Sequence, residues 1–184
     1  IAGVDEVGRG ALAGPVSACA CVLPPDVVIE GLRDSKVLPP PARARIAERV
    51  RAVSVDYHVA HVPAHIIDSI GIASATLLAM RQALAGLSVC VDHVVLDGRD
   101  VAIGCPHTAV VKGDSSVRAI AAAAVLAKVA RDELMSSLDV EHPGYGLAEN
   151  KGYGSAAHLA AIRRDGPSPI HRLSFAPCAQ SSLF

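Results

Sequence analysis

The sequence contains no tryptophan and few aromatic residues of any kind. Of its 184 residues, 3% are aromatic, 51% are hydrophobic and 19% are charged. This composition is ordinary for a packed globular protein and excludes an intrinsically disordered chain. The length supports one hydrophobic core and leaves little room for a second. We therefore expect a single domain over residues 1–184.

Long apolar runs are also absent. Pro15, Pro24, Pro25 and Lys128 interrupt the best candidates before they reach the roughly 18 to 20 residues that a membrane helix needs. The sequence opens on a strand-like segment rather than on the basic flank and apolar stretch of a secretory signal. We therefore expect a cytoplasmic protein without a membrane partner and, with no extended apolar patch evident, a monomer.

Several familiar motifs are missing. The five cysteines form an odd set without a C-x-x-C pair, and the eight histidines have no zinc-ligand spacing, which disfavours a disulfide framework and a zinc site. The sequence has neither a G-x-S-x-G motif nor a Walker loop, which disfavours acyl transfer and nucleoside triphosphate hydrolysis as its reaction. Cys19 and Cys21, two apart in an apolar run, should share one face of a strand and pack in the core.

The sequence has no excess of positive charge. Lys and Arg total 17 and Asp and Glu total 18, so the formal net charge is -1. If the protein binds nucleic acid, the positive charge must be local. Lys36, Lys112, Lys128 and Lys151 could supply it.

Hydrophobic periodicity and turn residues predict an α/β fold. The long Ala-rich helix is apolar nearly all round until Lys128, so it should be buried against a sheet. The order of elements predicts a mixed sheet with helices on its faces. The predicted strands are 1–6, 16–23, 53–62, 93–98 and 108–114, and the predicted helices are 39–53, 73–87, 115–138 and 155–164.

Three of the predicted strands carry carboxylates at their ends. These are Asp5 and Glu6 in GVDEVGRG, Asp97 in VVLDG and Asp114 in VVKGD. If the strands are neighbours, the carboxylates converge, and a cation must neutralise them. Oxygen ligands suit Mg²⁺ or Mn²⁺, and two such ions about 3.5 to 4 Å apart catalyse phosphodiester cleavage. Alternatively, each acid is a surface or capping residue, and Asp114 could cap the helix that follows it.

Two further segments suit contact with nucleic acid. Gly8, Arg9 and Gly10 would let backbone amides approach a strand while the guanidinium meets a phosphate, although an ordinary glycine turn is the alternative. Tyr153, in the polar stretch NKGYG, should be exposed and able to stack on a sugar or base. His171 has either a functional or a structural role in the final loop.

In their order along the chain, these motifs resemble the bacterial ribonuclease HII family, the type 2 ribonucleases H. The resemblance implies a ribonuclease H-like fold with a five-stranded mixed sheet flanked by helices. We expect a helix-and-loop extension from about 140 to 184 that contributes to substrate binding. The matching segments are GVDEVGRGALAGPV, DSKVL, IDSIGIASATLLAMRQAL, VVLDG, VVKGDSSVRAIAAAAVLAKVARDELM, HPGYGLAENKGYGSAAH and GPSPIHRLSF.

The resemblance also implies an activity. Such an enzyme hydrolyses the RNA strand of RNA/DNA hybrids and incises 5′ of single ribonucleotides in duplex DNA, leaving 5′-phosphate and 3′-hydroxyl ends. It uses two Mg²⁺ or Mn²⁺ ions. We expect Asp5, Asp97 and Asp114 to hold the ion that activates the attacking water. The second ion, near Glu6 and Asp5, would stabilise the departing 3′-oxygen.

The resemblance assigns substrate contacts as well. Gly8, Arg9 and Gly10 would sense the ribose 2′-hydroxyl and the phosphate beside the cut. Tyr153 would stack at the junction between RNA and DNA. We also expect Lys36 to contact the substrate.

The sequence departs from the family pattern at four positions, none of which removes a carboxylate. Gly71 replaces the usual Asn, which should remove a hydrogen bond to the substrate backbone; the other three are Val7 for Ala, Ala11 for Pro and Asn150 for His. The rival hypotheses are another metal-dependent nuclease of the same fold, such as a junction resolvase, and an inactive nucleic-acid-binding module. Fold alone cannot separate these activities.

Overall fold

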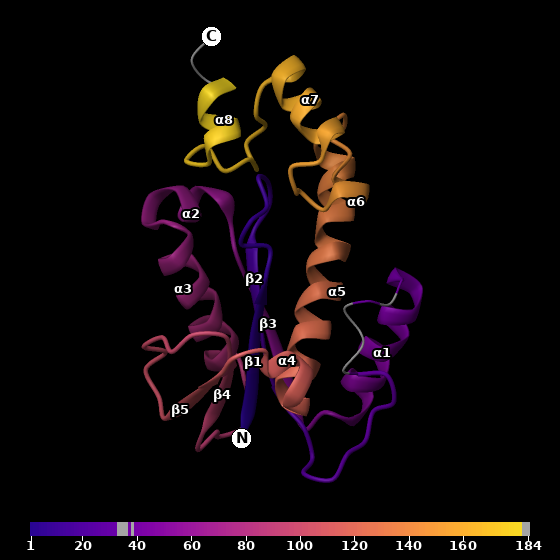
Figure 1. Cartoon of the computed structure of the whole chain (residues 1–184), viewed down its shortest axis with the longest axis vertical. Helices are drawn as coiled ribbons and strands as arrows, with labels where there is room; N and C mark the ends of the chain where they lie inside the picture. Colours follow the sequence, from indigo (N-terminus) through magenta and orange to yellow (C-terminus); the bar gives the residue numbers. More distant parts are fainter. Residues whose placement is uncertain (33–36, 38, 182–184) are drawn as a thin grey trace.

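A computed structural model describes residues 1–32, 37 and 39–181, and its centre is a five-stranded sheet (Figure 1). The strands lie in the order β3-β2-β1-β4-β5. The first three form an antiparallel meander, and β4 and β5 run parallel to β1, which confirms the predicted mixed sheet. The strands are β1 (Ala2–Val7), β2 (Val16–Val22), β3 (Asp56–Val62), β4 (Val94–Asp97) and β5 (His107–Val110).

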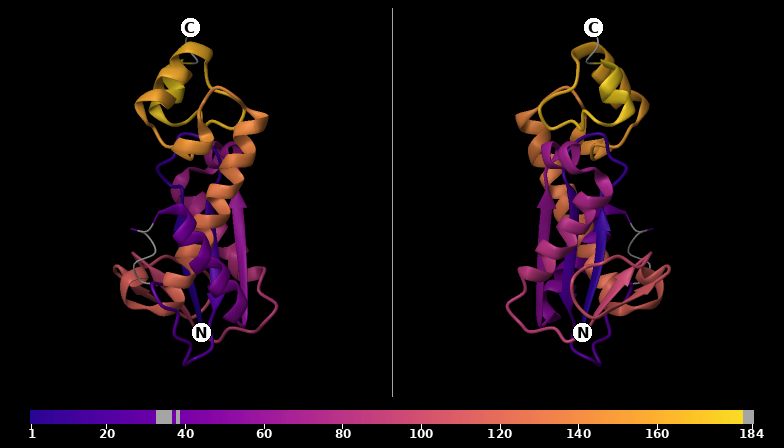
Figure 2. Two further views of the ribbon diagram at one scale, coloured as in Figure 1. Left: turned by 90° about the vertical axis from the view of Figure 1, so that its right-hand side faces the viewer. Right: turned by 90° about the vertical axis from the view of Figure 1, so that its left-hand side faces the viewer.

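Helices cover both faces of this sheet. Figure 2 shows α5 in front of the sheet from one side and α3 in front of it from the other. The helix α1 packs on α5, and α6, α7 and α8 lie beyond the end of the sheet that is opposite the N-terminus (Figure 1). The helices are α1 (Pro40–Val53), α2 (Ala64–Ile70), α3 (Ile72–Ala85), α4 (Gly113–Ser116), α5 (Arg118–Glu141), α6 (Leu147–Asn150), α7 (Ala156–Asp165) and α8 (Ala176–Ser181).

The alternation of strand side chains divides the core into two layers. Val4 and Leu96 belong to the cluster on the α3 side of the sheet. Cys19 and Cys21 are fully buried in the cluster that contains the alanines of α5, which confirms their predicted core role. The approach of α5 to β1 is close, since a Cβ on Gly3 would overlap the backbone of Ala119.

The helix predicted over 73–87 is present as α3, but α2 precedes it and was not predicted. The two helices meet at Gly71, whose backbone has φ 79° and ψ 155°. This region of conformational space is essentially restricted to glycine. The backbone conformation at this position therefore explains why a glycine joins the two helices.

The predicted boundary between the strand 108–114 and the helix 115–138 is wrong. The strand β5 ends at Val110, and Lys112 has a left-handed backbone with φ 56°. Asp114 therefore lies within the single turn of α4 rather than at a strand end. Val117 is extended, so the long helix begins only at Arg118. The amide of Gly113 binds the Asp97 carboxylate, and this contact turns the chain before the helix.

The C-terminal helices pack on the end of α5 through a third apolar cluster. This cluster joins Leu12 and Met135 to Leu147, Ile162 and Cys178. The segment is thus a helix-and-loop layer on the scaffold formed by the sheet and α5, and its part in substrate binding stays a prediction. Within the described ranges, none of the helices is long and apolar enough to cross a membrane.

Candidate functional site

The pairing of β1 with β4 brings three of the four predicted carboxylates to one region of the sheet. Val4 is paired with Leu96, so Asp5 and Asp97 each follow one member of a parallel pair. Asp97 accepts a hydrogen bond of 2.7 Å from the Gly113 amide. That bond brings α4, which carries Asp114, against the end of β4. The strands that carry the acids are therefore neighbours, as the sequence argument required.

Asp5 and Glu6 point to opposite faces of β1. Asp5 is 3% exposed and lies on the α5 side, where its Oδ1 accepts a 2.7 Å hydrogen bond from the Glu6 amide. Glu6 is half-buried on the other face and contributes to a pocket with residues of α3. Such alternation is what a regular strand imposes on neighbouring residues.

The side chains do not form a ready metal site. In the part of the chain that the structure describes, no three His, Cys, Asp or Glu side chains are grouped closely enough to hold an ion. The backbone segments converge as predicted, but the common ligation of an ion by Asp5, Glu6, Asp97 and Asp114 stays a prediction.

The capping alternative for Asp114 is wrong as stated. The residue that precedes α5 is Val117, and Asp114 lies inside α4. Neither helix has a side-chain hydrogen bond at its N-cap. Asp114 is half-buried.

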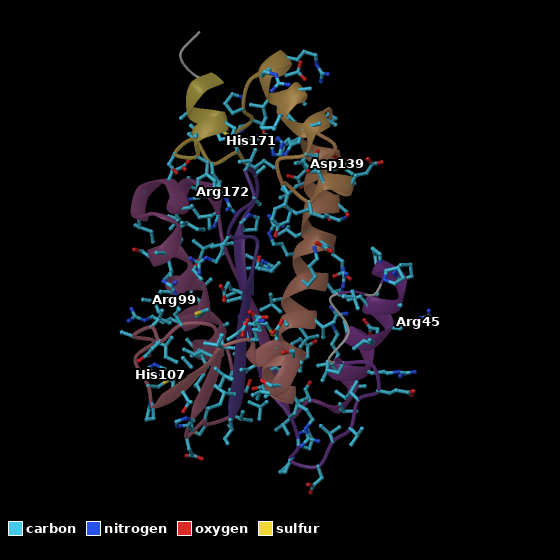
Figure 3. All side chains as sticks on the ribbon, viewed as in Figure 1. Arg45, Arg99, His107, Asp139, His171 and Arg172 are labelled. Carbon is cyan, nitrogen blue, oxygen red and sulfur yellow. The ribbon has the colours of Figure 1, made fainter. Side chains whose placement is uncertain are left out.

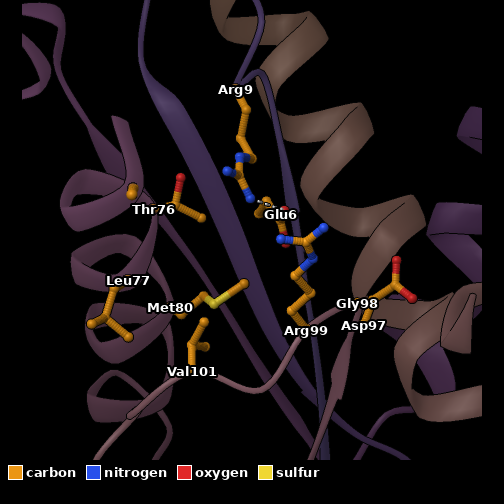
Figure 4. A pocket seen from close by; sticks show the side chains of 10 residues that line it. Glu6, Arg9, Thr76, Leu77, Met80, Asp97, Gly98, Arg99 and Val101 are labelled. Atoms are coloured by element: carbon orange, nitrogen blue, oxygen red, sulfur yellow. Dashed lines mark hydrogen bonds and ion pairs between the residues drawn. The ribbon is translucent and has the colours of Figure 1, made fainter. Parts of the chain in front are cut away.

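One pocket, of about 380 Å³, lies between the ends of β1 and β4 and α3 (Figure 4). Glu6 and Asp97 line it together with Arg9 and Arg99. Arg9 Nη1 donates a 3.3 Å hydrogen bond to Glu6 Oε1. In the view of Figure 4, Arg9 from above and Arg99 from below both point toward Glu6. This pocket therefore combines carboxylates with two guanidinium groups.

A second pocket, of about 280 Å³, lies on the other side of Glu6. Its lining includes Asp5, Arg43 from α1, Lys128 from α5 and Tyr153. Lys128 Nζ lies 2.7 Å from Asp132 Oδ1. Cationic side chains thus line both pockets beside Glu6, and in each pocket they lie among an equal number of carboxylates.

Tyr153 is exposed, as predicted. The residue is 37% exposed, and the guanidinium carbon of Arg131 lies 5.5 Å from the centre of its ring. The loop that carries Gly8, Arg9 and Gly10 follows β1 directly, and Arg9 and Gly10 are exposed. Gly8 is buried with φ 89°, and a Cβ there would overlap the Arg131 guanidinium.

The predicted lysines have different roles. Lys128 lines the second pocket, whereas Lys151 donates to Ser136 Oγ on α5, and Lys112 lies at the N-cap of α4. Lys36 lies outside the described residues. Sequence reasoning missed Arg43 and Arg99, although Arg99 follows the Asp97-Gly98 motif and its position could have indicated it.

Comparisons with known proteins agree with this architecture. The sequence matches the family model for Ribonuclease HII over residues 2–178. It is 49% identical over 193 residues to Ribonuclease HII of Thiobacillus denitrificans, covering 100% of this chain and 93% of that protein. It is 51% identical over 181 residues to Ribonuclease HII of a Synechococcus species, covering 96% of this chain and 81% of that protein.

Solved structures share the fold. The ribonuclease H2 from Pyrococcus horikoshii superposes with a TM-score of 0.83 at 24% identity, covering 98% of this chain and 95% of that one. The ribonuclease HIII designated Bst, in complex with Mn²⁺, gives a TM-score of 0.74 at 18% identity, covering 98% and 68%. The family match does not favour the junction-resolvase alternative. This chain belongs to the ribonuclease HII family.

Proposed function

We propose that this member of the ribonuclease HII family is an endoribonuclease that hydrolyses the RNA strand of RNA/DNA hybrids and incises 5′ of single ribonucleotides in duplex DNA. The observation that carries the proposal is the juxtaposition of Asp5 and Glu6 with Asp97 through the pairing of β1 and β4. Pockets lined by cationic side chains lie on both sides of Glu6.

The chemistry of the carboxylates fits divalent metal ions. All four proposed ligands, Asp5, Glu6, Asp97 and Asp114, offer only oxygen, which suits Mg²⁺ or Mn²⁺. A divalent ion bound there supplies an activated water and neutralises charge on the leaving oxygen, and two ions are part of the proposal. Since the side chains are not grouped in the described structure, their reorientation on binding is also part of it.

The cationic side chains have a separate role in the proposal. Arg9 and Arg99 on one side of Glu6, and Arg43 and Lys128 on the other, neutralise the phosphates next to the scissile bond. Once divalent ions neutralise the carboxylates, these four cations give the site the positive charge with which a chain of net charge -1 binds a polyanion.

Tyr153 and the glycine-flanked arginine read the substrate in this proposal. The exposed Tyr153 borders the pocket that also contains Asp5, so a sugar or base stacked on its ring lies next to the carboxylates. The exposed backbone of Arg9 and Gly10 offers amides to the ribose and its phosphate.

A substrate panel tests the proposal. Labelled duplexes with one ribonucleotide, a continuous hybrid, an all-DNA duplex and a four-way DNA junction are incubated with Mg²⁺, with Mn²⁺ or with a chelator. We expect metal-dependent cutting of the two ribonucleotide-containing substrates alone. Cutting of the junction would favour the rival nuclease, and binding without cutting at any metal concentration would favour the inactive module.

A further inference from the structure

A buried arginine holds the loop that follows β1 from the inside. Arg172 is fully buried, and its three guanidinium nitrogens each donate to a backbone carbonyl. Nη2 lies 2.7 Å from Gly8 O, Nη1 lies 2.8 Å from Arg9 O and Nε lies 3.1 Å from Gly14 O. A planar guanidinium can satisfy this set, whereas the single ammonium of lysine cannot.

These hydrogen bonds from Arg172 determine the direction in which the N–H groups of the loop point. In a trans peptide the C=O of one residue and the N–H of the next point in opposite directions. Because the carbonyls of Gly8 and Arg9 face Arg172, the N–H groups of Arg9 and Gly10 face away from it. Neither N–H donates to any residue in the described ranges. Two successive outward amides beside the Arg9 side chain can donate to an anion.

His171, the residue before Arg172, is connected by hydrogen bonds to the loop that carries Tyr153. The Ser168 amide, which can only donate, lies 3.0 Å from His171 Nδ1, so this nitrogen carries a lone pair. The proton of His171 is then on Nε2, which donates to His158 Nε2 at 3.0 Å. His158 in turn donates from Nδ1 to the Tyr153 carbonyl at 2.8 Å. Both histidines are buried and neutral in this chain of hydrogen bonds.

Backbone hydrogen bonds join the same segments. The Arg172 amide donates to Leu12 O at 2.8 Å, and the Leu12 amide donates to Gly152 O at 2.7 Å. A second buried arginine, Arg131, donates to Lys151 O at 2.8 Å and to Ala13 O at 3.2 Å. Figure 3 shows His171 and Arg172 between the sheet and the C-terminal helices.

We propose that His171 and Arg172 are positioning residues that hold the Gly8–Gly10 loop and Tyr153 in one fixed relation, so that recognition of the ribose and of the junction is coupled. The inference rests on the proposed function. Its basis is that two consecutive residues contact the two loops separately. Arg172 donates to the carbonyls of Gly8 and Arg9, and His171 reaches the Tyr153 carbonyl through His158. Neither residue lines the two pockets beside Glu6.

The test uses Arg172→Lys and His171→Gln, with Arg163→Lys on the exposed face of α7 as the matched control. Incision of the one-ribonucleotide duplex and of the continuous hybrid is measured for each, with circular dichroism as a check of folding. A partly unfolded enzyme loses active sites, which lowers kcat for both substrates and leaves KM and their ratio unchanged. Mispositioned loops change KM and the ratio.

We expect Arg172→Lys to raise KM about tenfold or more, because the loop, having lost one to two hydrogen bonds to charged nitrogen, is in its binding-competent position only part of the time. His171→Gln should reduce incision at the lone ribonucleotide more than cutting of the hybrid, and the reduction should nearly vanish in a Tyr153→Ala background, because interacting residues are not additive. If Arg172→Lys does not fold, the double-mutant cycle of His171→Gln and Tyr153→Ala tests the inference by itself.

Three results would overturn the inference alone: a KM for Arg172→Lys equal to that of the Arg163→Lys control, an unchanged substrate ratio for His171→Gln, or losses that multiply fully with Tyr153→Ala. No incision of either substrate by the unaltered enzyme would overturn the proposed function, and this inference with it. The two failures are therefore distinguishable.

Discussion

Acid should destabilise this fold through the buried histidine pair. Burial, together with the positive charge that a protonated His158 would place nearby, lowers the pKa of His171 to about 4. The Ser168 amide occupies the lone pair of Nδ1, so a proton there would displace a hydrogen bond. Burial also lowers the pKa of His158. The native state therefore favours neutral histidines.

The sign and size of the effect follow from linkage. Above pH 6.5, the ordinary value for histidine, neither the folded nor the unfolded chain protonates His171, and stability does not depend on this group. As the pH falls from 6.5 toward 4, the unfolded chain binds a proton that the folded chain does not, so stability decreases. At about 1.4 kcal/mol per pH unit, His171 accounts for a loss of about 3 kcal/mol across that window.

Urea unfolding followed by far-ultraviolet circular dichroism between pH 7.5 and 4.5 measures this loss, and the absence of tryptophan makes fluorescence a poor probe. In His171→Gln the loss between the two pH values should be smaller by about 2 kcal/mol. The exposed His65, replaced by Gln, is the matched control and should keep the full pH dependence. Equal pH dependence in both variants would refute the reasoning.

Three further predictions concern catalysis and packing. Asp97→Asn should reduce incision at least about a thousandfold while the circular dichroism spectrum stays unchanged, and wild-type turnover would contradict the carboxylate mechanism. Tyr153→Ala should impair cutting at a lone ribonucleotide more than cutting of a continuous hybrid, and equal losses would argue against junction sensing. Gly3→Ala should destabilise the protein by about 3 kcal/mol or more, because the added methyl overlaps the backbone of Ala119 on α5; a melting temperature equal to that of the wild type would show that the helix can shift.

The sheet and the long helix could be predicted from the sequence because the spacing of hydrophobic residues reflects which side chains are buried. The apolar alternation around Cys19 and Cys21 placed them in the core, and the alanine-rich segment was buried on the sheet as expected. The break at Gly71 and the turn of α4 could not be predicted in this way. Each depends on a single backbone conformation or on a contact, such as that of Gly113 with Asp97, between residues distant in the sequence.

The candidate site was predicted to the level of the backbone but not of the side chains. The pairing of β1 with β4 brings Asp5, Glu6 and Asp97 together, but Glu6 lines both pockets whereas Asp5 lines only one of them. The buried Arg131 and Arg172 were not predicted, because arginine is almost never fully buried unless it is paired, and here its partners are backbone carbonyls. The sequence pattern does not indicate which backbone carbonyls of a loop point into the protein, where a buried arginine can bind them.

The chemistry of the cut ends tests the central claim most directly. A duplex with one ribonucleotide, labelled on either side of it, is cut in the presence of Mg²⁺, and the ends of both fragments are identified by mass spectrometry. The carboxylate mechanism predicts one cut, 5′ of the ribonucleotide, with a 3′-hydroxyl on the upstream fragment and a 5′-phosphate on the ribonucleotide. A cut 3′ of the ribonucleotide that leaves a 2′,3′-cyclic phosphate would mean that the neighbouring 2′-hydroxyl attacks instead, and would contradict it.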